Sequence, residues 1–284
     1  MISLPLLKRN LAQTWKILLI ILAAMTMYTT VIIYMYDPEL AHMLNDYQQA
    51  LPGMMTAVGM TGIAGNLTEF VHIYLYGFIM LVFPVIFLII LGNKLLAHYV
   101  DTGSMAVLLS TPNSRTRILV TQLLTLLLET ALLIALITAI GIVSCESLFP
   151  GELDIPVYLK LNATLLLLHL MLGGIGFLPA CIFNDSKWYF FVGAGLLILF
   201  FLFQMLGNMG GDLEFFRYLT PFTLFPGEKI VSGQDGAAGS CVIMAVIGAA
   251  LYGSGVVCFG RKDLPLSHRL GCPYNAKKAA ISLP

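Results

Sequence analysis

The chain has 284 residues, 58% of them hydrophobic and only 11% charged, and its formal net charge is zero. A soluble domain carries roughly 25% charged residues, so this chain has too little polar surface for water and is predicted to be an integral membrane protein. The balanced charge gives no reason to expect binding to nucleic acid or another polyanion. The five cysteines show neither CxxC nor metal-ligand spacing, so we predict no disulfide framework and no metal site.

Residues 1–16 form an amphipathic segment, with leucines on one side of a helix and Lys8, Arg9 and Gln13 on the other. Such a pattern is typical of a helix that lies in the membrane interface. An apolar run from Ile17 to Tyr36 follows. It is too long for the apolar region of a signal peptide, and no small-x-small cleavage site ends it. We therefore interpret this run as a retained first span.

Five further apolar segments follow, each long enough to cross a bilayer as a helix. The proline at position 84 lies inside the second span, where it is tolerated if neighbouring groups satisfy the backbone carbonyl that it frees. The sequence thus predicts an all-α membrane domain over residues 17–259 and a tail over residues 260–284. The predicted spans are residues 17–36, 70–91, 118–144, 157–182, 188–206 and 240–259.

The basic residues predict the orientation of these spans. Six spans place both termini on one side, and twelve of the fifteen Lys and Arg residues then lie on that side. The other three are Lys160, Arg217 and Lys229, whereas most of the acidic residues lie in loops on the far side. Because basic residues concentrate on the cytoplasmic side of membrane proteins, we predict that both termini and the segment 92–117 are cytoplasmic.

The segment between the second and third spans has a helical pattern of its own. Met105, Leu108 and Leu109 recur at the spacing of one helix face, and Asp101 can cap the start of such a helix. A short surface helix between two spans either docks a soluble partner or rests on lipid headgroups. The residue pattern alone leaves both interpretations open.

Two ionisable residues, Glu129 and His169, lie near the middle of the third and fourth predicted spans. Charged groups are costly in hydrocarbon, so such residues are candidates for function. They either line a substrate path or form a proton-linked pair, or else they make interhelical hydrogen bonds that fix packing. A carboxyl group there without a cation partner favours its protonated form. Weaker polar candidates are Asn162, Gln204 and Asn208.

Motifs that would make the chain an enzyme are not found. The sequence contains no GxxxxGK[ST] phosphate loop, so it is not expected to bind ATP by that route. It also contains neither HExxH nor GxSxG, and no paired carboxylates with a matching base. We predict a membrane protein without catalytic residues of its own.

The local sequence resembles the ABC-2 type transporter permeases, and the resemblance covers nearly the whole chain. Asp101 stands where glutamate is common in that family. The segment around the family's coupling helix is similar to Asp101-Thr102-Gly103-Ser104-Met105, Leu108-Leu109-Ser110-Thr111-Pro112 and Ser114-Arg115. Motifs before and at the end of the last span resemble Tyr218-Leu219-Thr220-Pro221-Phe222 and Arg261-Lys262-Asp263-Leu264.

This resemblance implies the permease subunit of a bacterial ABC exporter in the cytoplasmic membrane. Such a subunit pairs as a homodimer or with a sister permease and docks separate ATPase subunits, which bind ATP and Mg²⁺, so this chain itself is expected to bind no cofactor. Arg115 and Arg117 are implied to anchor the coupling helix at headgroups. The implied docking residues are Asp101, Thr102, Gly103, Ser104, Met105, Leu108, Leu109 and Ser110. The alternatives are a secondary transporter or channel that uses Glu129 and His169, and a membrane enzyme or assembly factor.

Overall fold

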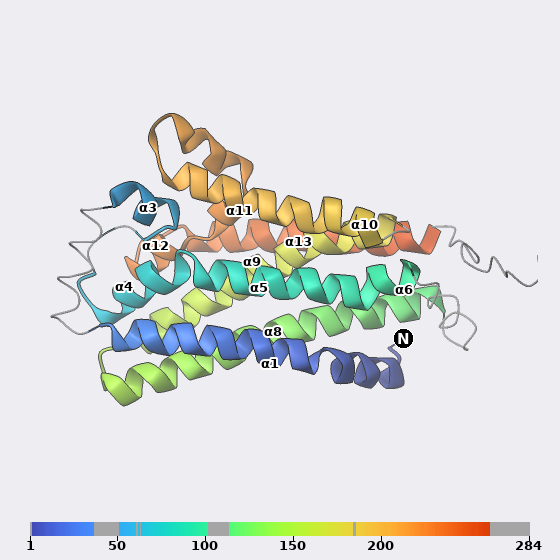
Figure 1. Ribbon diagram of the computed structural model, residues 1–284, viewed down its shortest axis with the longest axis horizontal. Coiled ribbons are helices and arrows are strands. Elements are labelled where there is room, and N and C mark those ends of the chain that lie inside the picture. The colour runs from blue at the N-terminus through green and yellow to red at the C-terminus, as the bar shows by residue number, and fades with distance from the viewer. Residues whose placement is uncertain are drawn as a thin grey trace, which may run out of the picture.

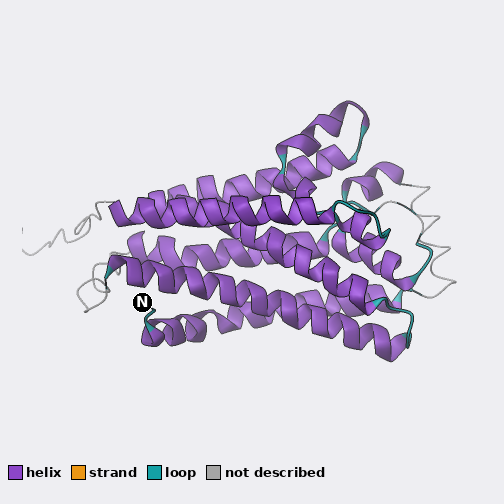
Figure 2. Cartoon of the chain, turned by 180° about the vertical axis from the view of Figure 1, so that it is seen from behind, coloured by secondary structure: helices purple, strands orange, loops and turns teal. Residues whose placement is uncertain are grey.

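The computed structural model describes residues 2–36, 51–60, 62, 64–101, 114–183 and 186–261. This part of the chain is built from helices and connecting loops and contains no strand (Figure 2). The helices are α1 (Leu4–Tyr34), α3 (Pro52–Ala57), α4 (Leu67–Val71), η1 (His72–Tyr76), α5 (Ile79–Gly92), η2 (Asn93–Ala97), α6 (His98–Asp101), α8 (Arg115–Leu148), α9 (Ile155–Ile182), α10 (Ser186–Trp188), η3 (Tyr189–Ala194), α11 (Gly195–Asn208), η4 (Gly211–Leu219), η5 (Pro221–Leu224), α12 (Gly227–Val231) and α13 (Ala237–Arg261).

Six helical stretches among the described residues are long and apolar enough to cross a membrane, which confirms the prediction of a six-span, all-α membrane protein. The predicted spans 118–144, 157–182 and 240–259 lie inside longer helices. The second span is less regular than predicted, because a turn at Gly77 and Phe78 separates α4 and η1 from α5. The six stretches are Leu4–Tyr34, Ile79–Ala97, Arg115–Leu148, Ile155–Ile182, Tyr189–Asn208 and Ala237–Arg261.

The spans run side by side along the long axis of the molecule, so that the bundle has two ends (Figure 1). The N-terminus, α6 and α10 lie at one end, and α3, α4 and α12 lie at the other. We call the first the basic end, after Lys8, Arg9, Lys94, Arg115, Arg117, Lys187 and Arg261. We call the second the acidic end, after Glu69, Glu146, Glu152, Asp154, Asp212, Glu214, Glu228 and Asp235.

α5 and α9 form the centre of the bundle. They are the most buried of the six spans, and α1, α11 and α13 are the least buried. α9 packs against α13, α5 and α8, while α1 lies along α8 and α5. Local sequence sets where α8 and α9 begin: the Ser114 side chain accepts a hydrogen bond from Arg117 N, and the Asp154 side chain accepts one from Val157 N.

The N-terminal segment differs from its prediction. We predict a separate interfacial helix over residues 1–16, but residues 4–16 are continuous with the first span in α1. The 31 residues of α1 correspond to about 46 Å at 1.5 Å per residue, which exceeds a hydrocarbon core of about 30 Å. The leucines are not buried as one face either. Asn10, Thr14 and Leu6 are buried, whereas Leu4 and Leu11 are exposed.

Candidate functional site

The predicted docking segment lies almost entirely outside the described residues. Its first residue, Asp101, is the last residue of α6, and residues 102–113 are not described. The structure does fix where the segment starts and ends. α6 ends and α8 begins at the basic end of the bundle (Figure 1), so the predicted docking residues connect two helices whose facing ends lie there.

The two predicted headgroup anchors stand at the start of α8. Arg115 is exposed, whereas Arg117 is half-buried. The Arg117 side chain donates from Nη2 to the backbone oxygen of Ile2 at 3.0 Å. Arg117 therefore links the N-terminal segment to α8. The prediction of a headgroup anchor does not include this contact within the protein.

Glu129 belongs to a line of polar contacts between α1 and α8, which we call the polar seam. No side chain of the seam is more than 4% exposed. Asn10 Nδ2 donates across the seam to Gln122 Oε1 at 2.6 Å and to Thr125 Oγ1 at 3.1 Å. The Thr14 hydroxyl is hydrogen-bonded to Glu129 Oε1. The seam consists of Ser3, Asn10, Thr14, Thr121, Gln122, Thr125 and Glu129.

Sequence reasoning identified Glu129 but missed its partners on both helices. A signal was present, since Thr121, Thr125 and Glu129 recur every fourth residue within a strongly apolar span. This spacing places the three side chains on one face of α8. Nothing in the pattern of α8 alone identifies α1 as the helix that covers that face.

His169 does not contact Glu129 through a hydrogen bond but lies between α9 and α5. Its Nε2 is 3.2 Å from the backbone oxygen of Leu81, and its Nδ1 is 2.9 Å from that of Leu165. Leu81 lies in the turn that precedes Pro84, where a proline weakens the hydrogen bonding of its own helix. The fully buried His169 ring thus lies between α9 and the turn of α5 that precedes Pro84.

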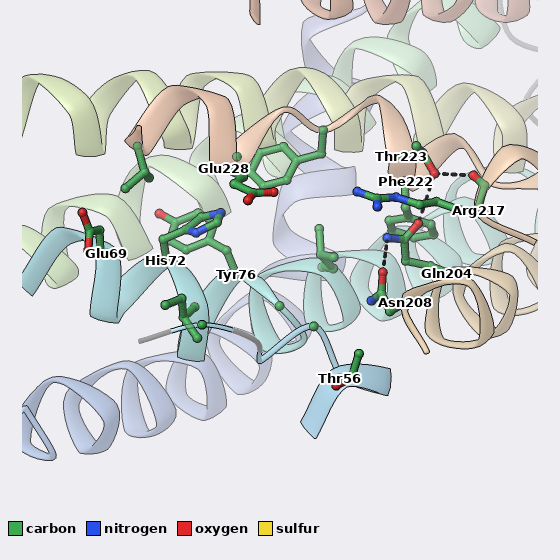
Figure 3. Close-up of a pocket in the computed structure, with 18 of the residues that line it drawn as sticks. Thr56, Glu69, His72, Tyr76, Gln204, Asn208, Arg217, Phe222, Thr223 and Glu228 are labelled. Atoms are coloured by element: carbon green, nitrogen blue, oxygen red, sulfur yellow. Dashed lines mark hydrogen bonds between the residues drawn. The ribbon is translucent and has the colours of Figure 1, made fainter. Parts of the chain in front are cut away.

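A polar pocket of about 420 Å³ opens at the acidic end (Figure 3). Its walls come from α3, α4 and η1, from α5 and α11, and from the segments η4, η5 and α12. Two of the weaker sequence candidates, Gln204 and Asn208, line it and are hydrogen-bonded to each other at 3.1 Å. The third, Asn162, is buried in α9 and donates to Tyr158 O within its own helix.

The pocket carries charges of both signs. Arg217 extends into it from one side and Glu228 from another (Figure 3). Glu69 is engaged in local structure, because its carboxylate accepts from Gly65 N at 2.7 Å and from Asn66 Nδ2 at 3.1 Å. Burial lowers the pKa of the His72 imidazole, which precedes the span that begins at Ile79, and the negative charge of Glu228 opposes this shift.

Close packing at Gly227 shapes this pocket. A Cβ atom at Gly227 would lie 2.5 Å from His72 Nε2 and 2.7 Å from Phe225 Cε1, so a larger residue there would force these two side chains to shift. Within the described residues, no group of three or more His, Cys, Asp or Glu side chains is placed to hold a metal ion. The arrangement suits hydrogen bonding and charge pairing with a polar or zwitterionic group.

The fold defines a multi-pass, all-α membrane protein with six spans. Residues 7–264 match the family model described as "ABC-2 family transporter protein". Because this match covers most of the chain, the chain belongs to that family and is a membrane transport permease, the non-catalytic component of an ABC transporter. Membership implies ABC ATPase partners. No curated protein matches the chain.

Proposed function

We propose that the chain is the permease subunit of an ATP-driven exporter in the bacterial cytoplasmic membrane, coupled to separate ATPase subunits. The family match over residues 7–264 carries this proposal. The charge asymmetry of the bundle supports the orientation, because the basic end then lies in the cytoplasm. ATP and Mg²⁺ bind to the ATPase subunits, since the sequence has no phosphate loop of its own.

In this proposal the ATPase docks at the basic end through residues 101–110. The docking segment leads directly to α8, whose 34 residues extend from the basic end to the acidic end. α8 packs against α1, α5, α9 and α13. A displacement at the start of α8 therefore reaches four other helices. This supports α8 as the element that transmits the movement of the ATPase to the spans.

A second permease completes the pathway, either a copy of this chain or a sister permease. The large exposed apolar faces of α1, α11 and α13 are available to such a partner and to lipid. The pocket at the acidic end then opens on the outer side of the membrane, where a cargo leaves. Its mixed charge is suited to an amphipathic cargo with a polar or zwitterionic head.

Co-purification from native membranes tests the docking step. Tagged wild-type chain should retain an ATPase subunit that contains a phosphate loop. In the double variant, Asp101→Arg reverses a charge at the proposed docking interface and Leu108→Asp places a charge where an apolar contact is expected. The amount of ATPase subunit retained should fall at least about tenfold. The control is Asp235→Lys, a charge reversal at an exposed residue of the acidic end. Equal retention by all three proteins would contradict the proposed docking site.

A further inference from the structure

The threonines of the polar seam share one hydrogen-bonding pattern. Thr121 Oγ1 donates to Arg117 O at 2.7 Å and accepts from Ser3 N across the seam. Thr125 Oγ1 donates to the backbone oxygen four residues before it at 2.8 Å and accepts from Asn10 across the seam. A hydroxyl group has a single proton to donate. Each of these threonines uses that proton within its own helix and is an acceptor towards the other helix.

Thr14 has the same geometry, with a carboxyl group opposite. Its Oγ1 lies 2.8 Å from the backbone oxygen of Asn10, four residues earlier, and also contacts Glu129 Oε1. If the Thr14 proton stays with the Asn10 oxygen, as the protons of the other two threonines stay within their helix, Thr14 can only accept from Glu129. The contact with Glu129 is then a hydrogen bond when Glu129 carries a proton and donates it to the Thr14 oxygen. The shared threonine pattern thus favours the neutral carboxylic acid at Glu129.

The surroundings of Glu129 favour the same form. The helices packed against α8 offer no charged partner: α5 has no titratable side chain, the three cations of α1 are exposed, and Lys94 donates to a backbone oxygen of α1. The His169 ring contacts backbone oxygens, and so does the Tyr252 hydroxyl of α13. A carboxylate in hydrocarbon without a cation is far more costly than the neutral acid.

The seam also has buried polar atoms that make no hydrogen bond. They are Glu129 Oε2, Asn10 Oδ1 and Gln122 Nε2, and Arg117 Nε lies at the end of the same line. The side chains of Glu129, Asn10 and Gln122 are each at most 2% exposed. Together these groups lead from the middle of α8 to the basic end. They supply both donors and acceptors along a route that is otherwise apolar.

We propose that the polar seam is a proton-binding site, in which Glu129 takes one proton from the solution at the basic end and holds it as a carboxylic acid between α1 and α8. The chemical step is the addition of one proton to the carboxylate and its loss by the same route. With the proton bound, Glu129 donates to Thr14 and joins the helices. Without it, an unpaired carboxylate lies in the buried seam, and its desolvation cost weakens the packing of α1 against α8. This site does not depend on the proposed export function.

Infrared spectroscopy of the purified protein in nanodiscs at pH 7 tests the proposal. The wild type should show the carbonyl stretch of a protonated carboxylic acid, and Glu129→Gln should remove it. Glu146→Gln, at the exposed end of the same helix, should leave it in place. Thr14→Val removes the acceptor, so the band should remain but shift. Absence of the band in the wild type, or its persistence in Glu129→Gln, would overturn the proposal.

Discussion

At the scale of single residues, glycines determine how closely the segments at the acidic end approach the spans. Gly207 of α11 faces the backbone of η4, and a Cβ atom added there would lie 2.6 Å from Arg217 N and 2.9 Å from its Cα. Backbone atoms cannot rotate away as a side-chain tip can. The position of Arg217 in the pocket therefore depends on the absence of a side chain at residue 207.

Gly207→Ala should accordingly destabilise the protein by about 1–3 kcal/mol, because the added methyl group overpacks the contact with η4. Gly253→Ala is the matched control, since a Cβ atom at Gly253 in α13 meets nothing within 4 Å. There the alanine should be neutral or stabilise the helix by up to about 1 kcal/mol. Denaturation of both variants measures the difference. Equal melting temperatures would show that η4 does not rest on Gly207.

At the scale of elements, α5 combines irregular backbone with a position at the centre of the bundle. It follows a turn at Gly77 and Phe78, contains Pro84, and continues into the π-helix η2. His169 of α9 contacts its Leu81 carbonyl. An irregular membrane helix is stable only where its neighbours satisfy its backbone. His169 therefore links the regular helix α9 to the irregular part of α5 through this contact.

His169→Leu should cost about 1–3 kcal/mol, because it removes a buried hydrogen-bond partner of the Leu81 backbone oxygen. Thr138→Val is the control in α8: the residue is also buried, but its hydrogen bond to Ile134 O stays within its own helix. The control should cost less. Thermal unfolding in detergent compares the two, and a larger loss for Thr138→Val would refute the supporting role of His169.

The sequence predicts the spans well because each is a long apolar run, and hydropathy alone is sufficient to identify such runs. It predicts contacts between spans poorly. Residues 1–16 contain three basic residues and several leucines, which indicates an interfacial helix, yet Asn10 and Thr14 face α8. In hydrocarbon, buried polar side chains seek partners on other helices. Hydropathy of one segment does not reveal which helix provides them.

The candidate sites show the same contrast: single residues could be predicted from the sequence, but their contacts on other helices could not. Glu129 and His169 were identifiable as single residues because any ionisable group in a span is costly. Their partners were not, since Thr14 and the Leu81 carbonyl lie 115 and 88 residues away along the chain. The pocket was likewise hidden. It is assembled from segments on both sides of the second span's start, from α11 and from the short segments after it, and no motif in these segments indicates a cavity.

At the scale of the whole molecule, the two ends of the bundle differ in charge and in the tasks that we propose for them. The basic end presents the two helix ends between which the proposed docking segment runs, and the acidic end contains the polar pocket. An exporter needs this polarity, because ATP is hydrolysed on one side of the membrane and cargo is released on the other. α8 spans the distance between them.

Arg217→Gln should lower ATP-driven accumulation of a fluorescent zwitterionic amphiphile in inverted vesicles about tenfold, because a lost charge contact of roughly 1.4 kcal/mol corresponds to that factor. Lys229→Gln is the control: it is another exposed cation at the acidic end, but it does not line the pocket. Its accumulation should match the wild type. If both variants accumulate the amphiphile equally, Arg217 has no part in cargo release.

The most direct test of the central claim is the rate of ATP hydrolysis by the complex purified through this chain from its native membrane. A permease driven by a docked ATPase predicts that the wild-type complex hydrolyses ATP. It also predicts that Asp101→Arg with Leu108→Asp abolishes this activity, while Asp235→Lys leaves it unchanged. A wild-type chain that purifies without ATP hydrolysis, or a docking variant that hydrolyses ATP at the wild-type rate, would contradict the account.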